Sequence, residues 1–395
     1  MISSYRASFN EHFSEKKYKG FLEELEKGFA EIPFRVAETP VFIPETLKEK
    51  LVAAGAEIVK LIQQPDFKQL TEKSIPLNWR VPAENGQPHF LTFDFGICKD
   101  EQGNLIPKLI EMQGFPSLYG FQAHLGETYK KAYSLSEQLT PYFDGIDQAA
   151  YIALLKEVIL GTHEPHEVAL MDIDAPNQKT AIDFLVTAQY LGIKILSLSD
   201  IRKEGKHLYY EQDGQKIRLK RIYNRLIFDE IGSNTDLFKE SFDPREELDI
   251  EWVTHPNWFY RISKYTMPFL KSEFVPETFF LHQLEVIPSD LENYVLKPLF
   301  SFAGMGVIID VKKKDIEEIS DPENWILQRK VNYEPVVQAP DGGVKVEIRL
   351  MYLWADGKEP VLCINLARLS RGKMIGVRYN KDFDWVGGTV GLMEK

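Results

Sequence analysis

The sequence contains little cysteine and no long apolar run, and both absences narrow the class of protein. Cys98 and Cys363 are its two cysteines among 395 residues, and they are too far apart in sequence for metal-type spacing. Such low cysteine usage favours a reducing compartment, so we expect a cytoplasmic protein. No apolar run approaches the roughly 18 residues that a membrane-spanning helix requires, so we expect no membrane partner. The opening residues, MISSYRASFNEHFSEKK, are polar and charged, unlike a secretory signal peptide.

The sequence also lacks an excess of basic residues. It has 47 lysines and arginines against 59 aspartates and glutamates, which gives a net charge of −12. This balance argues against nucleic acid as the main partner. A polyanionic ligand such as a nucleotide would have to be held by a few local lysines and arginines, together with Mg²⁺. An apolar content of 44% and a charged content of 27% are ordinary for a globular protein, and the length predicts two or three subdomains.

The N-terminal 75 residues have helical patterning. The apolar positions recur at steps of four and three, which is the stripe of an amphipathic helix. That helix is bracketed by Pro44 and Pro65. The stripe consists of Leu47, Leu51, Ala54, Ile58 and Leu61. We interpret it as core packing.

A strand–turn–strand hairpin is predicted between His89 and Gly120. The apolar runs FLTFDFGI and PKLIEMQ flank the polar turn DEQGN. Glu111 and Gln113 are two positions apart in the second strand and therefore share a face, where Asp94 of the first strand can meet them. Three oxygen-bearing side chains at one strand end suit Mg²⁺, which prefers hard oxygen ligands. The alternative is that Asp94 and Glu111 lie on the solvent face of a half-exposed sheet.

The middle of the chain has the pattern of an α/β unit. After a helix expected over 121–140, EVALMDI is predicted as a buried strand, TAIDFLVTAQYLGI as a helix closing at Gly192, and KILSLSDI as a second strand. The segment KHLYYEQDGQKIRLKRIYNRLI is predicted as a hairpin that turns at Asp213-Gly214. Arg225 is a candidate for reaching a ligand cleft at the strand ends. His163 and His166 have no cysteine partners, and a metal site there is not favoured.

A lysine and a glycine loop lie between two predicted strands in YVLKPLFSFAGMGVIIDV, residues 294–311. Lys297 ends the first strand, and the second is expected to start at Val307. The loop holds Gly304 and Gly306, whose backbone N–H groups can come close to an anion. The order differs from that of a P-loop, in which Gly-Lys-Ser/Thr opens a helix. The alternative is an ordinary hairpin with a glycine turn.

The last third of the chain is expected to end in one antiparallel sheet. The segments KVEIRLMYLW, PVLCINLARLS and GKMIGVRYN are predicted as its consecutive strands. They carry Glu347, Arg349, Arg368 and Arg378. Several arginines along alternating strands suggest a cationic face, and a solvated sheet face is the alternative.

These stretches together resemble the ATP-grasp superfamily, in the circularly permuted order of the glutathionylspermidine synthetase family. The resemblance covers residues 89–120 and about 255–390. In ordinary ATP-grasp ligases the acidic metal motif comes last, whereas here Asp94-Phe95 and the run LIEMQ at 109–113 come before the lysines. The resemblance implies an α/β (α+β) protein with the ATP-grasp fold in permuted order. It implies N-terminal helices plus the metal hairpin at 1–145, a pre-ATP-grasp-like α/β domain at 146–250, and the lysine and glycine-loop subdomain with the C-terminal sheet at 251–395.

The resemblance also assigns roles to residues. It implies ATP and Mg²⁺ as cofactors and small-molecule carboxylate and amine substrates. Metal binding is implied for Asp94, Glu111 and Gln113, and action on the transferring phosphate for Arg349 or Arg368. Cofactor binding is implied for the lysines Lys264 and Lys297, for the glycine-loop residues Ser301, Ala303, Gly304 and Gly306, and for the adenine hinge Gln328, Arg329, Lys330 and Val331.

Two departures from the family pattern leave the function open. Thr92 stands where glutathionylspermidine synthetases carry an arginine, and Gln113 replaces the usual asparagine. The leading hypothesis is an ATP-dependent carboxylate–amine ligase that works through an acyl phosphate. One alternative is a nucleotide-binding protein without ligase chemistry, which both departures favour. Another is a kinase acting on a small hydroxyl compound.

Overall fold

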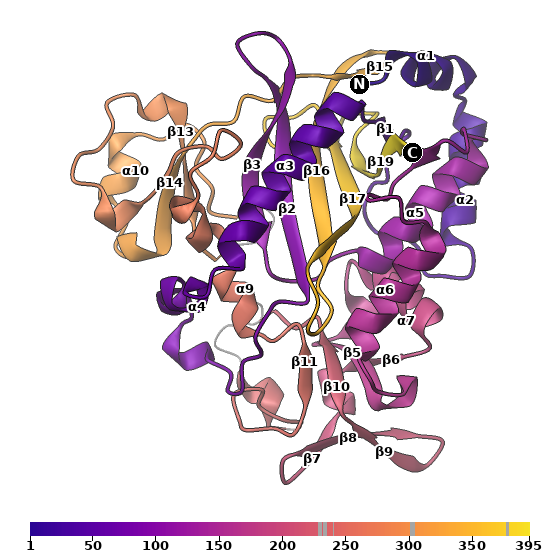
Figure 1. Cartoon of the computed structure of the whole chain (residues 1–395), viewed down its shortest axis with the longest axis vertical. Helices are drawn as coiled ribbons and strands as arrows, with labels where there is room; N and C mark the ends of the chain where they lie inside the picture. Colours follow the sequence, from indigo (N-terminus) through magenta and orange to yellow (C-terminus); the bar gives the residue numbers. More distant parts are fainter. Residues whose placement is uncertain (228–230, 232–234, 240, 301–304, 377–378) are drawn as a thin grey trace.

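The computed structural model (Figure 1) describes the whole chain except residues 228–230, 232–234, 240, 301–304 and 377–378. Its largest sheet has six strands in the order β18-β17-β16-β2-β3, with β15 beside β16. The strands are β2 (Phe90–Lys99), β3 (Leu105–Gln113), β15 (Val337–Ala339), β16 (Gly342–Leu353), β17 (Val361–Ser370) and β18 (Gly387–Thr389). Because β2 pairs with β16, segments about 250 residues apart in sequence lie side by side, as in the pairing of Asp94 with Arg349.

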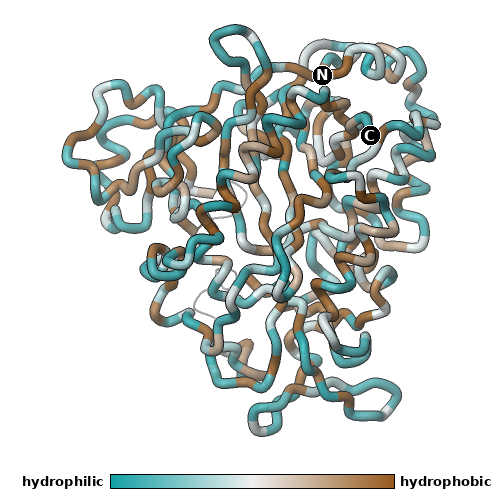
Figure 2. Tube along the Cα trace, viewed as in Figure 1, coloured by the Kyte–Doolittle hydropathy of each residue, from teal (hydrophilic) through white to brown (hydrophobic). Residues whose placement is uncertain are grey.

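The two faces of this sheet differ in chemistry. Alternate residues of β2 such as Phe93 and Phe95 point into the main apolar core, whereas Thr92 and Asp94 point to the opposite face. Helix α3 (Glu45–Ile62) packs on the apolar face and confirms the predicted stripe. Helices α1 (Ser3–His12), α2 (Glu15–Glu26) and α5 (Tyr119–Ala132) contribute to the same core. Figure 2 shows hydrophobic residues concentrated along the central strands and hydrophilic ones in the outer loops.

The predicted α/β unit is confirmed. Its parallel sheet has the order β11-β10-β5-β6, made of β5 (Val168–Asp172), β6 (Lys194–Ser197), β10 (Arg221–Asn224) and β11 (Glu251–Val253). Helices α6 (Gln148–Leu160) and α7 (Ala181–Leu191) accompany it. The hairpin of β8 (His207–Gln212) and β9 (Gln215–Leu219) turns at the expected Asp213-Gly214, with β7 (Arg202–Glu204) beside it. The rest of that segment, β10, leaves the hairpin for the parallel sheet, and β11 joins it from just beyond residue 250.

The lysine segment lies in a small separate sheet of order β12-β14-β13, seen on the left of Figure 1 with α10 (Lys313–Glu317). Its strands are β12 (Thr278–Phe280), β13 (Tyr294–Pro298) and β14 (Trp325–Arg329). The expected second strand from Val307 is wrong, because Ile308 makes only an isolated bridge to Leu296. The partner of β13 is β14, and an apolar cluster that includes Leu296 and Leu327 holds the two together.

The expected strand over 372–380 is also wrong for the described residues of that segment, and β18 occupies the sheet edge instead. The side chain of Asn380 explains the difference. Its Oδ1 accepts hydrogen bonds from the backbone N–H groups of Arg371 and Gly372, and its Nδ2 donates to the carbonyl oxygens of Met374 and Gly376. These bonds satisfy the backbone of a compact loop, so no strand partner is needed there.

The remaining elements join the two ends of the chain to the core. A three-stranded sheet has the order β1-β19-β4. These elements are β1 (Val41–Phe42), β4 (Leu139–Thr140), β19 (Gly391–Glu394), α4 (Phe67–Leu70) and α9 (Asn257–Arg261). Among the described residues, no helix is both long and apolar enough to cross a membrane.

Candidate functional site

The small sheet meets the large sheet at a buried lysine. Lys297 Nζ donates to the carbonyl oxygen of Ile110 on β3 at 2.9 Å and to Oε1 of Gln328 at 2.5 Å. Lys297 lies on β13, and the register Val295–Gln328 places the Gln328 side chain on the same sheet face. Lys297 therefore contacts the β2–β3 hairpin at Ile110, which is 187 positions earlier in the sequence.

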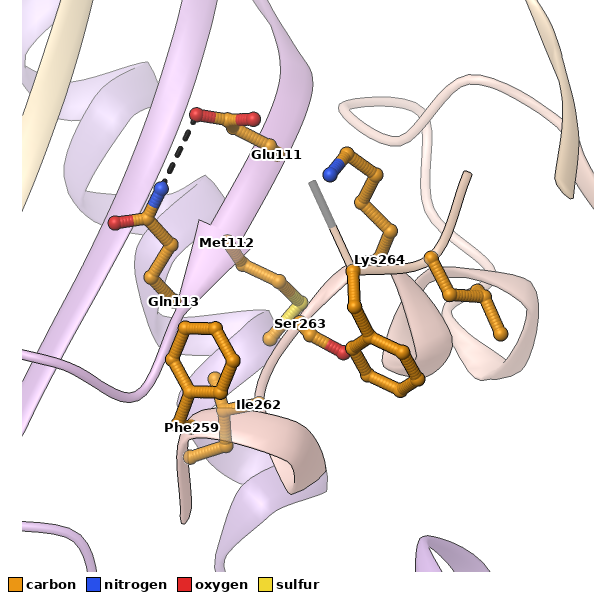
Figure 3. Close-up of a pocket in the computed structure, with 9 residues that line it drawn as sticks. Glu111, Met112, Gln113, Phe259, Ile262, Ser263 and Lys264 are labelled. Atoms are coloured by element: carbon orange, nitrogen blue, oxygen red, sulfur yellow. Dashed lines mark hydrogen bonds between the residues drawn. The ribbon is translucent and has the colours of Figure 1, made fainter. Parts of the chain in front are cut away.

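A pocket opens beside this contact (Figure 3). Its walls come from the end of β3, from the segment after α9 and from the segment after β13. Figure 3 shows Lys264 across the pocket from Glu111, with Gln113 beside Glu111. Lys264 opens a short 3₁₀ helix, whose N-cap residue Ser263 accepts from the Tyr265 N–H. The lining residues are Glu111, Met112, Gln113, Phe259, Ile262, Ser263, Lys264, Leu299 and Phe300.

Lys297 is a buried cation that lies near a second cation, Lys264. Lys297 is 7% exposed. Burial lowers the pKa of Lys297 to about 8; Glu111 opposes this effect and Lys264 adds to it. Glu347 also opposes the shift, so the two ammonium groups lie near two carboxylates, Glu111 and Glu347.

A second group of charges covers the polar face of the large sheet. Asp94 is 1% exposed, and its oxygens accept from Arg349 Nε at 2.5 Å, Arg349 Nη2 at 2.7 Å and Arg368 Nη2 at 2.5 Å. Burial opposes ionisation of Asp94, but the two guanidinium groups outweigh it and lower its pKa to about 2. The register explains the meeting, because Asp94 pairs with Arg349, and Glu347 pairs with Arg368.

Arg368 is the more accessible of the two arginines. Its side chain is 34% exposed, compared with 6% for Arg349. Arg368 also binds Oε1 of Glu347, and Glu347 Oε2 accepts from the Tyr333 hydroxyl at 2.9 Å. Burial raises the pKa of Glu347, with Arg368 opposing and Asp94 reinforcing the shift. Tyr333 was not predicted from the sequence, because no motif marks a single tyrosine that follows a strand.

The expected metal ligands lie on one face but are not equally free to bind a metal. Both oxygens of Asp94 are taken by arginine, whereas Glu111 is partly exposed and lies 3.2 Å from the Gln113 amide nitrogen. Across the described part of the chain, no group of three or more His, Cys, Asp or Glu side chains is arranged to hold a metal ion. Mg²⁺ commonly takes one or two protein ligands and completes its shell with phosphate and water. Glu111 fits that pattern as it stands, whereas Gln113 would join it only after its amide turns so that the oxygen, in place of the nitrogen, faces Glu111.

The expected adenine hinge is partly used by the small sheet. The backbone N–H groups of Arg329 and Lys330 already donate to the carbonyl oxygens of Glu277 and Asn293, at 2.9 and 2.8 Å. Gln328 is 1% exposed, and its Nε2 is buried without a hydrogen-bond partner among the described residues. Such a donor costs free energy unless a ligand satisfies it. Val331 follows in the chain leading back to the large sheet, packed on the main core.

The glycine loop is described only in part. Gly306 has φ +72°, and a Cβ there would lie 3.1 Å from Pro298, so glycine suits this position. Ser301, Ala303 and Gly304 lie outside the described residues, as does Arg378.

Two further candidates from the sequence form ion pairs. Arg225 is buried and pairs with Asp183 at 3.1 Å, so this arginine ties β10 to α7. His163 pairs with Glu251 at 3.1 Å at the surface of the α/β unit.

The fold has a known counterpart. The structure is similar to that of a glutathione synthetase-like effector (GSS30) from Globodera pallida in its apo form, with a TM-score of 0.59. The match covers 96% of each chain at 10% sequence identity, so the likeness shows the fold alone. No protein-family model matches the chain. No curated protein matches its sequence.

Proposed function

We propose that this protein is an ATP-dependent carboxylate–amine ligase with the ATP-grasp fold in circularly permuted order. The observation that carries the proposal is the meeting of Lys264, Glu111 and Gln113 around one pocket. Lys297 lies next to them, bonded to the carbonyl oxygen of Ile110 on β3. The similarity to the glutathione synthetase-like fold supports the proposal. The α/β unit would be the pre-ATP-grasp-like domain.

The roles follow from charge and exposure. Lys264 and Lys297 would bind phosphate oxygens, and the free amide N–H of Gln328 would donate to the nucleotide. Bound on Glu111 and Gln113, Mg²⁺ would supply positive charge to the phosphates. Arg368 would stabilise the γ-phosphoryl group while the substrate carboxylate attacks it, because its side chain is the more exposed of the two.

The reaction needs no nucleophilic side chain. The substrate carboxylate takes the γ-phosphoryl group, giving an acyl phosphate and ADP. The amine then attacks the acyl carbon, and phosphate leaves as the amide forms. The arginine pair would also stabilise the oxyanion of that tetrahedral adduct.

A nucleotide-binding protein without ligase activity is the second candidate. The observation that favours it is the capture of Asp94 by two arginines, since this removes an expected metal ligand. Thr92, where the related family has arginine, is buried and its hydroxyl has no partner among the described residues. A site with fewer metal ligands and one fewer arginine is less equipped for phosphoryl transfer.

One experiment separates the candidates. Purified protein is incubated with ATP, Mg²⁺ and panels of amino acids, small peptides and polyamines, and ADP release is measured. ADP release that requires both an acid and an amine, with an amide product by mass spectrometry, supports the ligase. ATP binding without turnover across the panel supports the binding protein, and a stable phosphorylated product contradicts both. Lys264→Met and Lys297→Met should each lower the affinity for ATP by about 10–100-fold.

A further inference from the structure

The segment from Lys330 to Val336 bridges the two sheets. At its start, the Lys330 N–H donates to the Asn293 carbonyl oxygen on the small-sheet side at 2.8 Å. Further on, the Glu334 N–H donates to the Ile97 carbonyl oxygen of β2 at 3.0 Å. Tyr333 therefore sits in a stretch that is tied at both ends and continues directly from the expected hinge residues.

The aromatic ring of Tyr333 needs a glycine beneath it. A Cβ built on Gly96 of β2 would lie 2.7 Å from Tyr333 Cε1 and 2.8 Å from Cζ. Real side chains do not approach so closely, so any residue other than glycine would displace the ring. Gly96 pairs with Glu347 of β16, which places the Tyr333 hydroxyl within reach of the Glu347 carboxylate.

The hydrogen bonds continue from Tyr333 to the arginine pair. The Tyr333 hydroxyl donates to Glu347 Oε2 at 2.9 Å, and Glu347 Oε1 accepts from Arg368 Nη2. Arg368 Nη2 also donates to Asp94 Oδ2, while its Nε has no partner in the described part of the chain. Glu347 and Asp94 thus hold Arg368 from two sides through its Nη2.

We propose that Tyr333 is a positioning residue that fixes Arg368 through Glu347 and so couples the hinge segment to the γ-phosphate end of the site. This inference rests on the proposed nucleotide site. Arg368 is a long side chain, 34% exposed, and it would lose its fixed direction if either carboxylate were free to rotate. The Tyr333 hydroxyl removes that freedom from Glu347. The hinge segment and the guanidinium group that would contact the terminal phosphate are therefore linked by one chain of hydrogen bonds.

The test compares two nucleotides on the full-length protein. Calorimetry measures the Kd of ADP and of a non-hydrolysable ATP analogue for wild type and Tyr333→Phe. We expect Tyr333→Phe to weaken the ATP analogue about fivefold, equivalent to about 1 kcal/mol, and ADP less than twofold. Glu347→Gln should change the ratio of the two affinities in the same direction. If turnover is detected, Tyr333→Phe should lower kcat with little change in the KM for ATP.

The matched control is Tyr210→Phe. The hydroxyl of Tyr210 also donates one hydrogen bond, to the His166 carbonyl oxygen at 2.9 Å, but within the α/β unit. Its removal should leave both affinities unchanged, and thermal unfolding verifies that each variant is folded. Equal affinity ratios in wild type, Tyr333→Phe and Glu347→Gln would overturn the coupling while leaving the proposed function intact. A wild type that binds neither nucleotide would overturn the proposed function, and the coupling with it.

Discussion

Replacing Lys297 with methionine tests whether the buried charge of this lysine lowers the stability of the fold while contributing to ligand binding. The pKa of Lys297 falls from 10.5 in the unfolded chain to about 8 in the fold. That shift corresponds to about 3 kcal/mol of destabilisation at neutral pH, which an apolar side chain of similar length would remove. The substitution also leaves the Ile110 carbonyl oxygen and Gln328 Oε1 without a donor, at about 1–2 kcal/mol each. These terms nearly cancel, so we expect Lys297→Met to unfold within about 1 kcal/mol of wild type at pH 7.

The pH dependence of stability distinguishes two opposing effects that cancel from a substitution that has no effect on stability. Between pH 8 and 10.5 the unfolded chain holds the Lys297 proton and the folded chain does not, so wild-type stability rises with pH. From pH 7 to 9.5 the gain attributable to Lys297 is about 2 kcal/mol. Urea unfolding at both pH values gives the free energies of unfolding of wild type and Lys297→Met. The gain is the change with pH in the difference between these two free energies. Affinity for an ATP analogue at pH 7 should meanwhile fall by about 10–100-fold in the variant.

The control for losing one lysine is Lys313→Met. Lys313 is exposed on α10 with 73% of its side chain accessible, so its pH dependence should match that of wild type. Parallel stability curves for wild type and Lys297→Met between pH 7 and 9.5 would refute the buried-cation account. If Lys297→Met lost several kcal/mol of unfolding free energy at pH 7, the two effects would not cancel as expected.

Three further substitutions probe other parts of the fold. Asp94→Asn should cost about 3–5 kcal/mol in urea unfolding at pH 7, because two guanidinium groups lose their carboxylate. Wild type should lose about 2 kcal/mol of stability as the pH falls from about 4 toward 2, because the pKa of Asp94 is lowered to about 2, whereas the variant should not. Gly96→Ala should lower the melting temperature and selectively weaken ATP-analogue binding, because the Tyr333 ring must move. Arg221→Met, which removes donors to the Val158 and Ile159 carbonyl oxygens of α6, should cost about 3 kcal/mol by urea unfolding, with nucleotide affinity unchanged.

The sequence predicted local structure well where periodicity was strong. The α3 stripe, the β2–β3 hairpin and the turn at Asp213-Gly214 all follow from local spacing and turn chemistry, and each is present. The second strand at Val307 failed, because an apolar run does not reveal which strand it pairs with. The loop around Asn380 failed because one side chain satisfies several backbone groups, and no periodic pattern encodes this.

The site was predictable in its residue types but not in its pairing. The sequence indicated that Asp94 can meet Glu111 and Gln113 across a hairpin, and the register pairs Asp94 with Glu111. The sequence could not show that β16 would lie on the other side of β2 and bring Arg349 onto Asp94. Partners of this kind depend on sheet order, which is a property of the whole fold. The contacts of Tyr333 with Gly96 and Glu347 also depend on sheet order, so they could not be predicted from the sequence.

The pairing of β2 with β16 has a consequence for synthesis of the chain. Asp94 emerges from the ribosome 255 residues before Arg349, an interval of roughly 10–50 s at usual elongation rates. Throughout that time the hydrogen-bonding edge of β2 and its phenylalanines have no native neighbour on that side. An apolar strand with an open edge is a template for association with other nascent chains. Productive folding of this protein should therefore depend on a holdase-type chaperone that shields residues 90–99 until the last third of the chain has been made.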